Sequence, residues 1–270
     1  MNIKVQIAND TFDLDGSDPI DISIPLRFNG LQPNAFGVPP ATSEPCVSGE
    51  LIGDTRRGGS CNFEQVTLIP HCNGTHTECV GHITDERISI RDSLQEAFVL
   101  SKLVTIAPEQ HAGSETYSMP IAETDVVITR ASLERSIAAS IDNCTGLIIR
   151  TSPNDDSKLS RRYVDEIPAY FTTEAMEFIV GLGIRHLLVD LPSIDRLSDE
   201  GRLSNHRVFW RLDQGSREMA SSVRRDCTIT ELIYVPDQAR DGMYLLNLQI
   251  APFAADASPS RPLLFAIGDN

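Results

Sequence analysis

The sequence is poor in basic residues and contains no long apolar segment. Its 270 residues include 23 Lys and Arg against 38 Asp and Glu, a formal net charge of −15 at pH 7. Nucleic acids and anionic membrane surfaces bind basic patches, so this balance argues against both as partners. No apolar run is long enough to span a bilayer, and residues 1–7 lack the apolar core of a secretory signal. We therefore expect a cytoplasmic protein.

Several catalytic and binding motifs are also missing. No Gly-x-Ser-x-Gly elbow is present, so nothing supports a serine-nucleophile hydrolase. A Gly-x-Gly at residues 181–183 lacks the third glycine and the preceding strand of a dinucleotide site. The six cysteines form no CxxC pair or disulfide framework, so in a reducing cytosol we expect free thiols. The 41% hydrophobic content is that of an ordinary globular protein.

One short segment, residues 69–82, is unusually rich in metal-binding side chains. It holds three of the six histidines together with a glutamate and two cysteines: His71, Cys72, His76, Glu78, Cys79 and His82. These side chains bind borderline-soft divalent metals through N, S and O. If the segment is extended, side chains two, four and six apart share one face, so the even-numbered ligands lie together: Cys72, His76, Glu78 and His82. His71 would point to the other face unless a β-bulge changed its direction. A polar loop with capping histidines is the alternative, but the density favours a metal site.

The same segment resembles the signature of the metal-dependent cyclase and arylformamidase family, His-x-Gly-Thr-His-x-Asp-x-Pro-x-His. The matching residues are Gly74, Thr75, His76 and His82. Three positions depart from the signature: Cys72 replaces its first histidine, Glu78 its aspartate and Val80 its proline. His71 lies one residue before the first-histidine position, so the first ligand is either Cys72 or His71. The similarity covers most of residues 45–270.

The resemblance extends to three segments further along the chain. Residues 190–195 are similar to the family's Asp-x-Pro-Ser-x-Asp turn, whose carboxylates could hold histidines or helix N-termini. His206 matches a metal-binding histidine at the start of a helix, and Glu231 matches the last ligand. A lone glutamate in an apolar strand is costly to bury without a cation, which gives an independent reason to place Glu231 at the metal.

The resemblance implies a metal-dependent hydrolase of an amide or cyclic amide, acting on a small molecule. It implies one or two divalent ions, Zn or Mn, with a metal-bound water as nucleophile. Cys72 or His71, His76 and Glu78 would hold the first ion, while Glu78 would bridge to a second at His206 and Glu231. His82 would carry protons, and Phe36 would either line the substrate pocket or pack on the core. The alternatives are a non-catalytic binding protein that kept this fold and a closed structural metal site.

We expect a mixed α/β fold in a single domain over residues 1–270, with many strands and few helices. The resemblance implies a swivelling β/β/α architecture and a homodimer or homotetramer, in which a long early loop at residues 29–62 could reach a neighbouring chain. Periodicity predicts strands at 2–7, 20–24, 64–69, 100–107, 146–151, 184–189, 228–233, 243–252 and 261–267, and helices at 91–100, 129–141 and 172–182.

Overall fold

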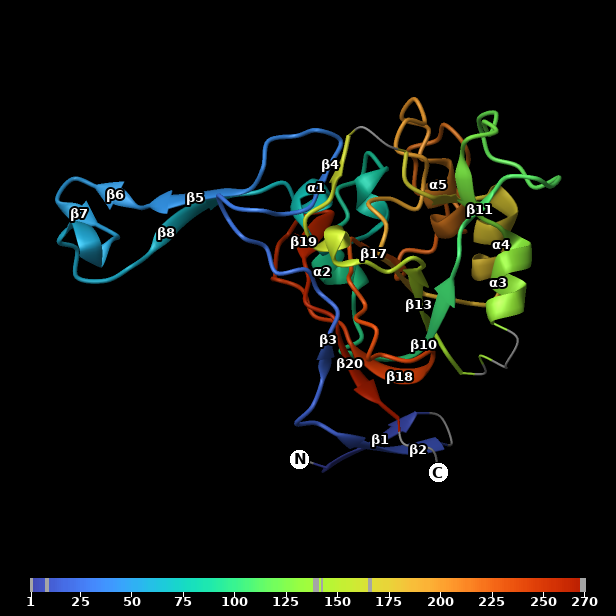
Figure 1. Ribbon diagram of the computed structural model, residues 1–270, viewed down its shortest axis with the longest axis horizontal. Coiled ribbons are helices and arrows are strands. Elements are labelled where there is room, and N and C mark those ends of the chain that lie inside the picture. The colour runs from blue at the N-terminus through green and yellow to red at the C-terminus, as the bar shows by residue number, and fades with distance from the viewer. Residues whose placement is uncertain (1, 8–9, 138–140, 142, 165–166, 268–270) are drawn as a thin grey trace.

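The centre of the molecule is a large, curled, mixed β-sheet (Figure 1). The computed structural model describes the whole chain except residues 1, 8–9, 138–140, 142, 165–166 and 268–270. Nine strands form the sheet, in the order β19 (Ala257–Pro259), β9 (His76–Glu78), β17 (Thr228–Glu231), β16 (His186–Val189), β13 (Gly146–Thr151), β10 (Phe98–Ile106), β18 (Gly242–Asn247), β20 (Leu263–Ala266) and β3 (Ile20–Asp21). The predicted mixed α/β class is confirmed.

Four strands in the middle of this sheet, β17, β16, β13 and β10, run parallel, and the flanking pairs are antiparallel. Both faces of the parallel part are covered, so every residue of β13 is buried. Leu147 and Ile149 pack into the core beneath the helices, whereas Ile148 packs into the core on the opposite face. The parallel pairing of β16 with β17 places their carboxyl ends beside each other, at the edge where the polar motifs gather.

Helices cover one face of the sheet (Figure 1). They are α3 (Arg130–Ser136), α4 (Thr173–Gly181) and α5 (Ser204–Trp210), and their buried residues include Leu133, Ile179 and Trp210. The hydroxyls of Thr129 and Thr172 cap the first two helices. The predicted helix at 172–182 is therefore confirmed. The predicted helix at 129–141 is confirmed only as far as Ser136, where α3 ends, and residues 138–140 lie outside the described residues.

The helix predicted at residues 91–100 is wrong. A single turn, α2 (Ile90–Ser93), is followed by Leu94 in extended conformation, and β10 begins at Phe98. The apolar residues of this segment have helical spacing, but β10 pairs with β13 on one side and with β18 on the other, and this pairing requires a strand. Val99 and Leu100 are buried in that central strand, and tertiary pairing overrides the local pattern.

Residues 29–62 do not form the predicted irregular loop. They contain the short strands β4 (Asn34–Ala35), β5 (Thr42–Pro45), β6 (Val47–Ser48) and β7 (Leu51–Ile52) and the turn η1 (Thr55–Arg57). β5 pairs with β8 (Glu64–Thr67), and β6 pairs with β7. Residues 42–67, which we call the β-arm, extend away from the rest of the molecule (Figure 1).

The remaining elements are small. β1 (Asn2–Ile7) and β2 (Asp10–Asp15) form a hairpin, as expected for residues 2–7. The predicted strand at 20–24 is reduced to β3 and a bridge between Ser23 and Ile233. The others are β11 (Glu109–Gln110), β12 (Val126–Ile128), β14 (Arg162–Tyr163), β15 (Tyr170–Phe171) and η3 (Asp156–Leu159). Within the described ranges, no helix is both long enough and apolar enough to cross a membrane.

Candidate metal centre

The histidine-rich segment is not extended over its whole length, contrary to the prediction. It forms a helical turn, α1 (Pro70–Asn73), then β9, then a second turn, η2 (Val80–His82). Pro70 starts the first turn, where its fixed φ suits a helix, and Ile69 N donates to Asn73 Oδ1 at 2.7 Å. The even-number argument therefore fails for Cys72, because a helical turn does not alternate its side chains between two faces.

The alternation does hold within β9. Thr77 points to one face, where its hydroxyl bonds that of Thr230 at 2.8 Å. His76 and Glu78 point to the other face, and His76 lies directly opposite Glu231 of β17. Two neighbouring antiparallel strands thus deliver a histidine and two carboxylates to one place.

A threonine hydroxyl fixes the end of β17. Thr75 Oγ1 accepts from Ile24 N at 2.8 Å and donates to Leu232 O at 2.5 Å. Leu232 has a φ of +54°, so the chain leaves the sheet immediately after Glu231. The Glu231 side chain therefore stands at the carboxyl end of a strand.

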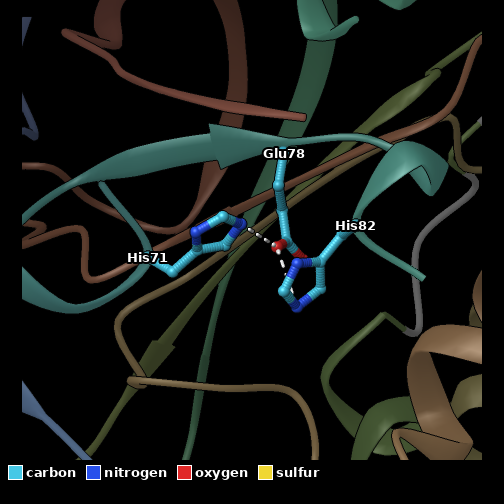
Figure 2. A group of neighbouring side chains, drawn as sticks. All are labelled: His71, Glu78 and His82. Carbon is cyan, nitrogen blue, oxygen red and sulfur yellow. Dashed lines mark ion pairs between the residues drawn. The ribbon is translucent and has the colours of Figure 1, made fainter. Parts of the chain in front are cut away.

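A first group of possible metal ligands consists of His71, Glu78 and His82 (Figure 2). Oε2 of Glu78 lies 3.5 Å from His71 Nε2 and 3.9 Å from His82 Nε2. The two imidazoles stack at 4.4 Å between ring centroids. Their side chains are 24% and 27% exposed, so a small molecule can reach this group from solvent.

A second, buried group consists of Glu78, His206 and Glu231. His206 Nε2 lies 2.9 Å from Glu78 Oε1 and 3.7 Å from Glu231 Oε1. Glu231 Oε1 also accepts from Ile194 N at 2.8 Å. Glu78 belongs to both groups and directs one oxygen to each, the arrangement expected of a bridging carboxylate.

Asp195 fixes the orientation of His206 through the ring nitrogen that does not face Glu78. His206 Nδ1 lies 2.6 Å from Asp195 Oδ2, and the same carboxylate accepts from Asn205 N at 2.7 Å and Tyr117 Oη at 2.8 Å. Asp195 thus orients a histidine and binds backbone N–H groups at the start of α5, as predicted for this turn. Asp190, the other carboxylate of the turn, instead forms a buried ion pair with Lys158 at 2.8 Å.

Asp256 is a site residue that the sequence did not indicate. Its Oδ2 lies 3.1 Å from His71 Nε2 and 3.2 Å from His82 Nδ1. The contacts with His71 and then His82 hold the pKa of this carboxyl far below its usual range. Asp256 follows Ala254 and Ala255 in an otherwise unremarkable segment, and only the pairing of β19 with β9 brings it to the motif.

Two further residues expected to bind the first ion, His76 and Cys72, belong to neither group of possible ligands. His76 is fully buried and its Nε2 lies 3.6 Å from Glu231 Oε2. Cys72 is buried and belongs to neither group of possible ligands in the described part of the chain. Burial, and then the charge of Glu231, raises the pKa of the Cys72 thiol to about 11. Because His71 belongs to a group of possible ligands and Cys72 does not, the geometry favours His71 as the first ligand.

The charges in the centre depend on one another. Burial alone would raise the pKa of Glu78, but His82 and His206 outweigh it and lower that pKa. Burial would lower the pKa of His206, but attraction to Glu78 and the bond to Asp195 raise it well above its ordinary value. Without a cation, a protonated His206 lies between Glu78 and Asp195 and balances part of their negative charge.

These features fit a divalent cation. The buried Nε2 atom of His76 has no hydrogen-bond partner in the described structure, and buried polar atoms are rarely left unpaired without a reason. The Nε2 atom of His71 faces only carboxylates, Asp256 at 3.1 Å and Glu78 at 3.5 Å. Among the described residues, no Lys or Arg forms an ion pair with Glu78, Glu231 or Asp256. Imidazole nitrogens and carboxylate oxygens form a donor set suited to zinc or manganese.

Phe36 lies away from the core. Its side chain is 52% exposed and its φ is +58°. The interpretation that Phe36 packs on the core is therefore wrong. Its proposed place in the substrate pocket stays a prediction.

Comparison with known proteins gives the family of the chain. Residues 20–196, more than half of the chain, match the family model named Cyclase. The chain belongs to the Cyclase family. The resemblance seen in the histidine-rich segment is thereby confirmed.

Curated relatives of this family member span its length. Kynurenine formamidase from Bacillus cytotoxicus is 24% identical over 250 residues, covering 92% of this chain and 97% of the relative. Kynurenine formamidase from Bacillus anthracis is 24% identical over 247 residues, covering 91% and 96%.

Solved structures share the fold. A "predicted metal-dependent hydrolase" from Bacillus stearothermophilus superimposes with a TM-score of 0.59 at 17% identity, covering 92% of this chain and 98% of that one. Isatin hydrolase A from Labrenzia aggregata superimposes with a TM-score of 0.62 at 15% identity, covering 93% and 94%. The architecture of the chain is therefore that of the cyclase-family structures.

Proposed function

We propose that this Cyclase-family protein is a metal-dependent hydrolase that cleaves the C–N bond of an amide or cyclic amide. The observation that carries the proposal is the shared carboxylate of Glu78, which directs one oxygen to each of two histidine–carboxylate groups. The kynurenine formamidase relatives and the isatin hydrolase neighbours support an amide or lactam as substrate class.

His71 and Glu78 of the first group would hold one divalent ion, zinc or manganese, and Glu78, His206 and Glu231 would hold a second. His76, whose Nε2 lies 3.6 Å from Glu231 Oε2, would be a further ligand. His82, the third member of the first group, would carry protons and would not be a required ligand. When bound, such an ion lowers the pKa of a water molecule to about 7 and polarises the substrate carbonyl. The bond from Asp195 fixes the ring of His206, so its Nε2 faces Glu78.

His82 is suited to move a proton. His82 Nδ1 lies 3.2 Å from Asp256 Oδ2, so the tautomer that donates to Asp256 presents an Nε2 lone pair to the Glu78 side of the centre. His82 Nε2 would accept a proton from the attacking water and return it to the leaving nitrogen. The 27% exposure of this ring places it between solvent and the buried ligands.

An apolar cavity of about 430 Å³ lies beside the same segment. Its lining includes Ile24, Leu26, Leu68, Pro70 and Gly74. We propose that it receives the non-polar part of the substrate, since ligand sites are mostly apolar with a few polar groups at one end.

The replacement His82→Ala tests this mechanism. We expect bound metal and substrate affinity to be retained and turnover to fall by about 10²–10⁴-fold, the usual contribution of a general acid–base. The assay follows formate release from N-formyl anilines and ring opening of cyclic amides, with metal content measured on the same sample.

The two alternative readings give different results in this experiment. If His82 is a structural ligand, the variant loses metal and thermal stability. If the protein binds ligands without catalysis, neither wild type nor variant turns over any compound of the panel. Full activity of His82→Ala with metal bound would contradict the proposed role of this histidine.

A further inference from the structure

A second cavity, separate from the metal centre, is lined by arginines. It has a volume of about 680 Å³ and lies beside α5. Its lining contains Arg202, Arg207 and Arg217 and, within the described ranges, no Asp or Glu. In a chain with 38 acidic and 23 basic residues, three guanidinium groups around one cavity without a carboxylate are unexpected. None of the proposed metal ligands lines this cavity.

Arg207 is oriented by the backbone rather than neutralised by an acid. Its side chain donates to the carbonyls of Arg202 at 2.9 Å, Asp213 at 3.1 Å and Ser216 at 2.5 Å. Its Nη2 has no hydrogen-bond partner in the described structure, although the residue is only 7% exposed. Among the described residues no carboxylate forms an ion pair with Arg207, so its Nη2 is free to donate to an anion in the cavity.

The other two arginines are more exposed. Arg202 pairs with Glu200 at 2.9 Å and donates to Ser118 O. Arg217 has only a 4.0 Å contact with Asp85, and both of these side chains are more than 70% exposed. Little attraction is expected at that distance between exposed charges. Arg217 is therefore available to the cavity.

Hydroxyl and amide groups complete the lining. Thr116, Ser118, Thr173 and Ser204 supply hydroxyls, and Gln214 supplies an amide. The hydroxyls of Thr116, Ser118 and Ser204 already donate to other residues, so the guanidinium groups are the main donors that the cavity offers. A rigid guanidinium matches the oxygens of a phosphate or carboxylate. We propose that this cavity binds a small oxyanion, a phosphate- or carboxylate-bearing molecule.

The cavity is connected to the metal centre by hydrogen bonds. Ser118 Oγ donates to Ser204 Oγ at 2.9 Å, and Ser204 Oγ donates to Asp195 Oδ1 at 3.2 Å. Asp195 holds His206, a proposed metal ligand on the same helix as Arg207. An anion that engages Ser118 or Ser204 would thus contact the residues that position this histidine.

The test measures binding of inorganic phosphate, sulfate and malonate to the purified protein by calorimetry at constant ionic strength, against chloride. We expect one of these probes to bind, and Arg217→Gln to weaken its binding about tenfold, as for the loss of one charge-assisted hydrogen bond. The double replacement Arg202→Gln and Arg217→Gln should abolish binding. The probe that binds identifies phosphate or carboxylate as the recognised group.

Arg225→Gln is the matched control, because Arg225 is exposed, pairs with Glu86 at 3.3 Å and does not line the cavity. It should bind the probe like the wild type. The metal-centre variant His71→Ala, which is expected to lose metal, should also bind it, which separates this site from capture of the anion by metal. Absence of binding by all three probes, or undiminished binding by the double variant, would overturn the proposal.

Discussion

At the scale of single residues, the centre depends on Glu78 and on the histidines around it. Its two oxygens face different groups, and the pKa of this buried carboxyl is lowered despite burial because His82 and His206 lie beside it. A neutral side chain at this position would leave the surrounding histidines without their common partner.

The choice between His71 and Cys72 is the first prediction at this scale. His71 Nε2 lies 3.5 Å from Glu78 Oε2, whereas the Cys72 thiol lies outside both groups and has its pKa raised to about 11. We expect His71→Ala to lower metal occupancy strongly and Cys72→Ser to leave it unchanged, as measured by elemental analysis. The opposite pattern would show that Cys72 takes the place of the first histidine of the family signature.

Asp256 gives the second prediction. Because it fixes the tautomer of His82, Asp256→Asn should lower kcat by about 10²-fold or more, within the range of general acid–base effects, while metal content stays the same. Asp13→Asn, an exposed aspartate paired with Lys4, serves as the control. An unchanged kcat in the Asp256 variant would remove this residue from the mechanism.

At the scale of secondary-structure elements, adjacent strands bring together residues from distant parts of the sequence. β9 and β17 place His76 opposite Glu231, and β19 carries Asp256 to the same edge. The parallel strand β16 supports them and contains the fully buried His186, which bonds Thr228 at 2.9 Å. His186 is therefore a core residue.

His186 gives a pH prediction. Burial lowers its pKa below the ordinary value of 6.5, and the nearby Glu96 only partly opposes this effect. Below pH 6.5 His186 binds a proton in the unfolded chain but stays neutral in the folded chain. The free energy of unfolding therefore decreases as the pH is lowered from 6.5 to the folded pKa.

The measurement compares urea unfolding of wild type and His186→Gln between pH 7 and 4.5, both without metal. The other titrating groups contribute to both proteins, so the difference isolates His186. The variant should lose less stability on acidification. Equal slopes in the two proteins would mean that His186 is protonated in the folded state.

The sequence predicted individual elements well where periodicity and burial agreed. The strands containing Leu147, Leu187 and Ile229 and the helix capped by Thr172 are present where expected. The pattern failed around Leu100, where pairing with two neighbouring strands overrode helical spacing.

Site residues were predictable only where a motif marked them. The motif in residues 69–82 indicated His76 and Glu78. A strand-like alternation of side chains over this segment predicts that His71 points away from the site, and it fails because Pro70 starts a helical turn there. Asp256 carries no local signal, because only the register of β19 against β9 makes it a neighbour of His82.

At the scale of the whole molecule, the β-arm extends away from the rest of the structure (Figure 1). Every residue of β8 is exposed, and Val47, Leu51 and Val66 are each about half exposed. An extended hairpin with apolar side chains in solvent is stabilised when it packs against another chain.

The homodimer or homotetramer expected from the family resemblance therefore has a specific test. The double replacement Val47→Asp and Leu51→Asp should shift the protein to monomer in light scattering at micromolar concentration. Leu31→Asp, an exposed leucine outside the β-arm, is the control and should not. A wild-type monomer, or an assembly that survives both charges, would contradict a role for the β-arm in assembly.

The central claim is that two histidine–carboxylate groups sharing Glu78 hold divalent metal. The most direct test is elemental analysis of protein purified without added metal, followed by titration with zinc and manganese. We predict about one to two ions per chain, from a donor set of imidazole and carboxylate groups. Metal-free protein with an intact fold and no affinity for added zinc or manganese would contradict the account.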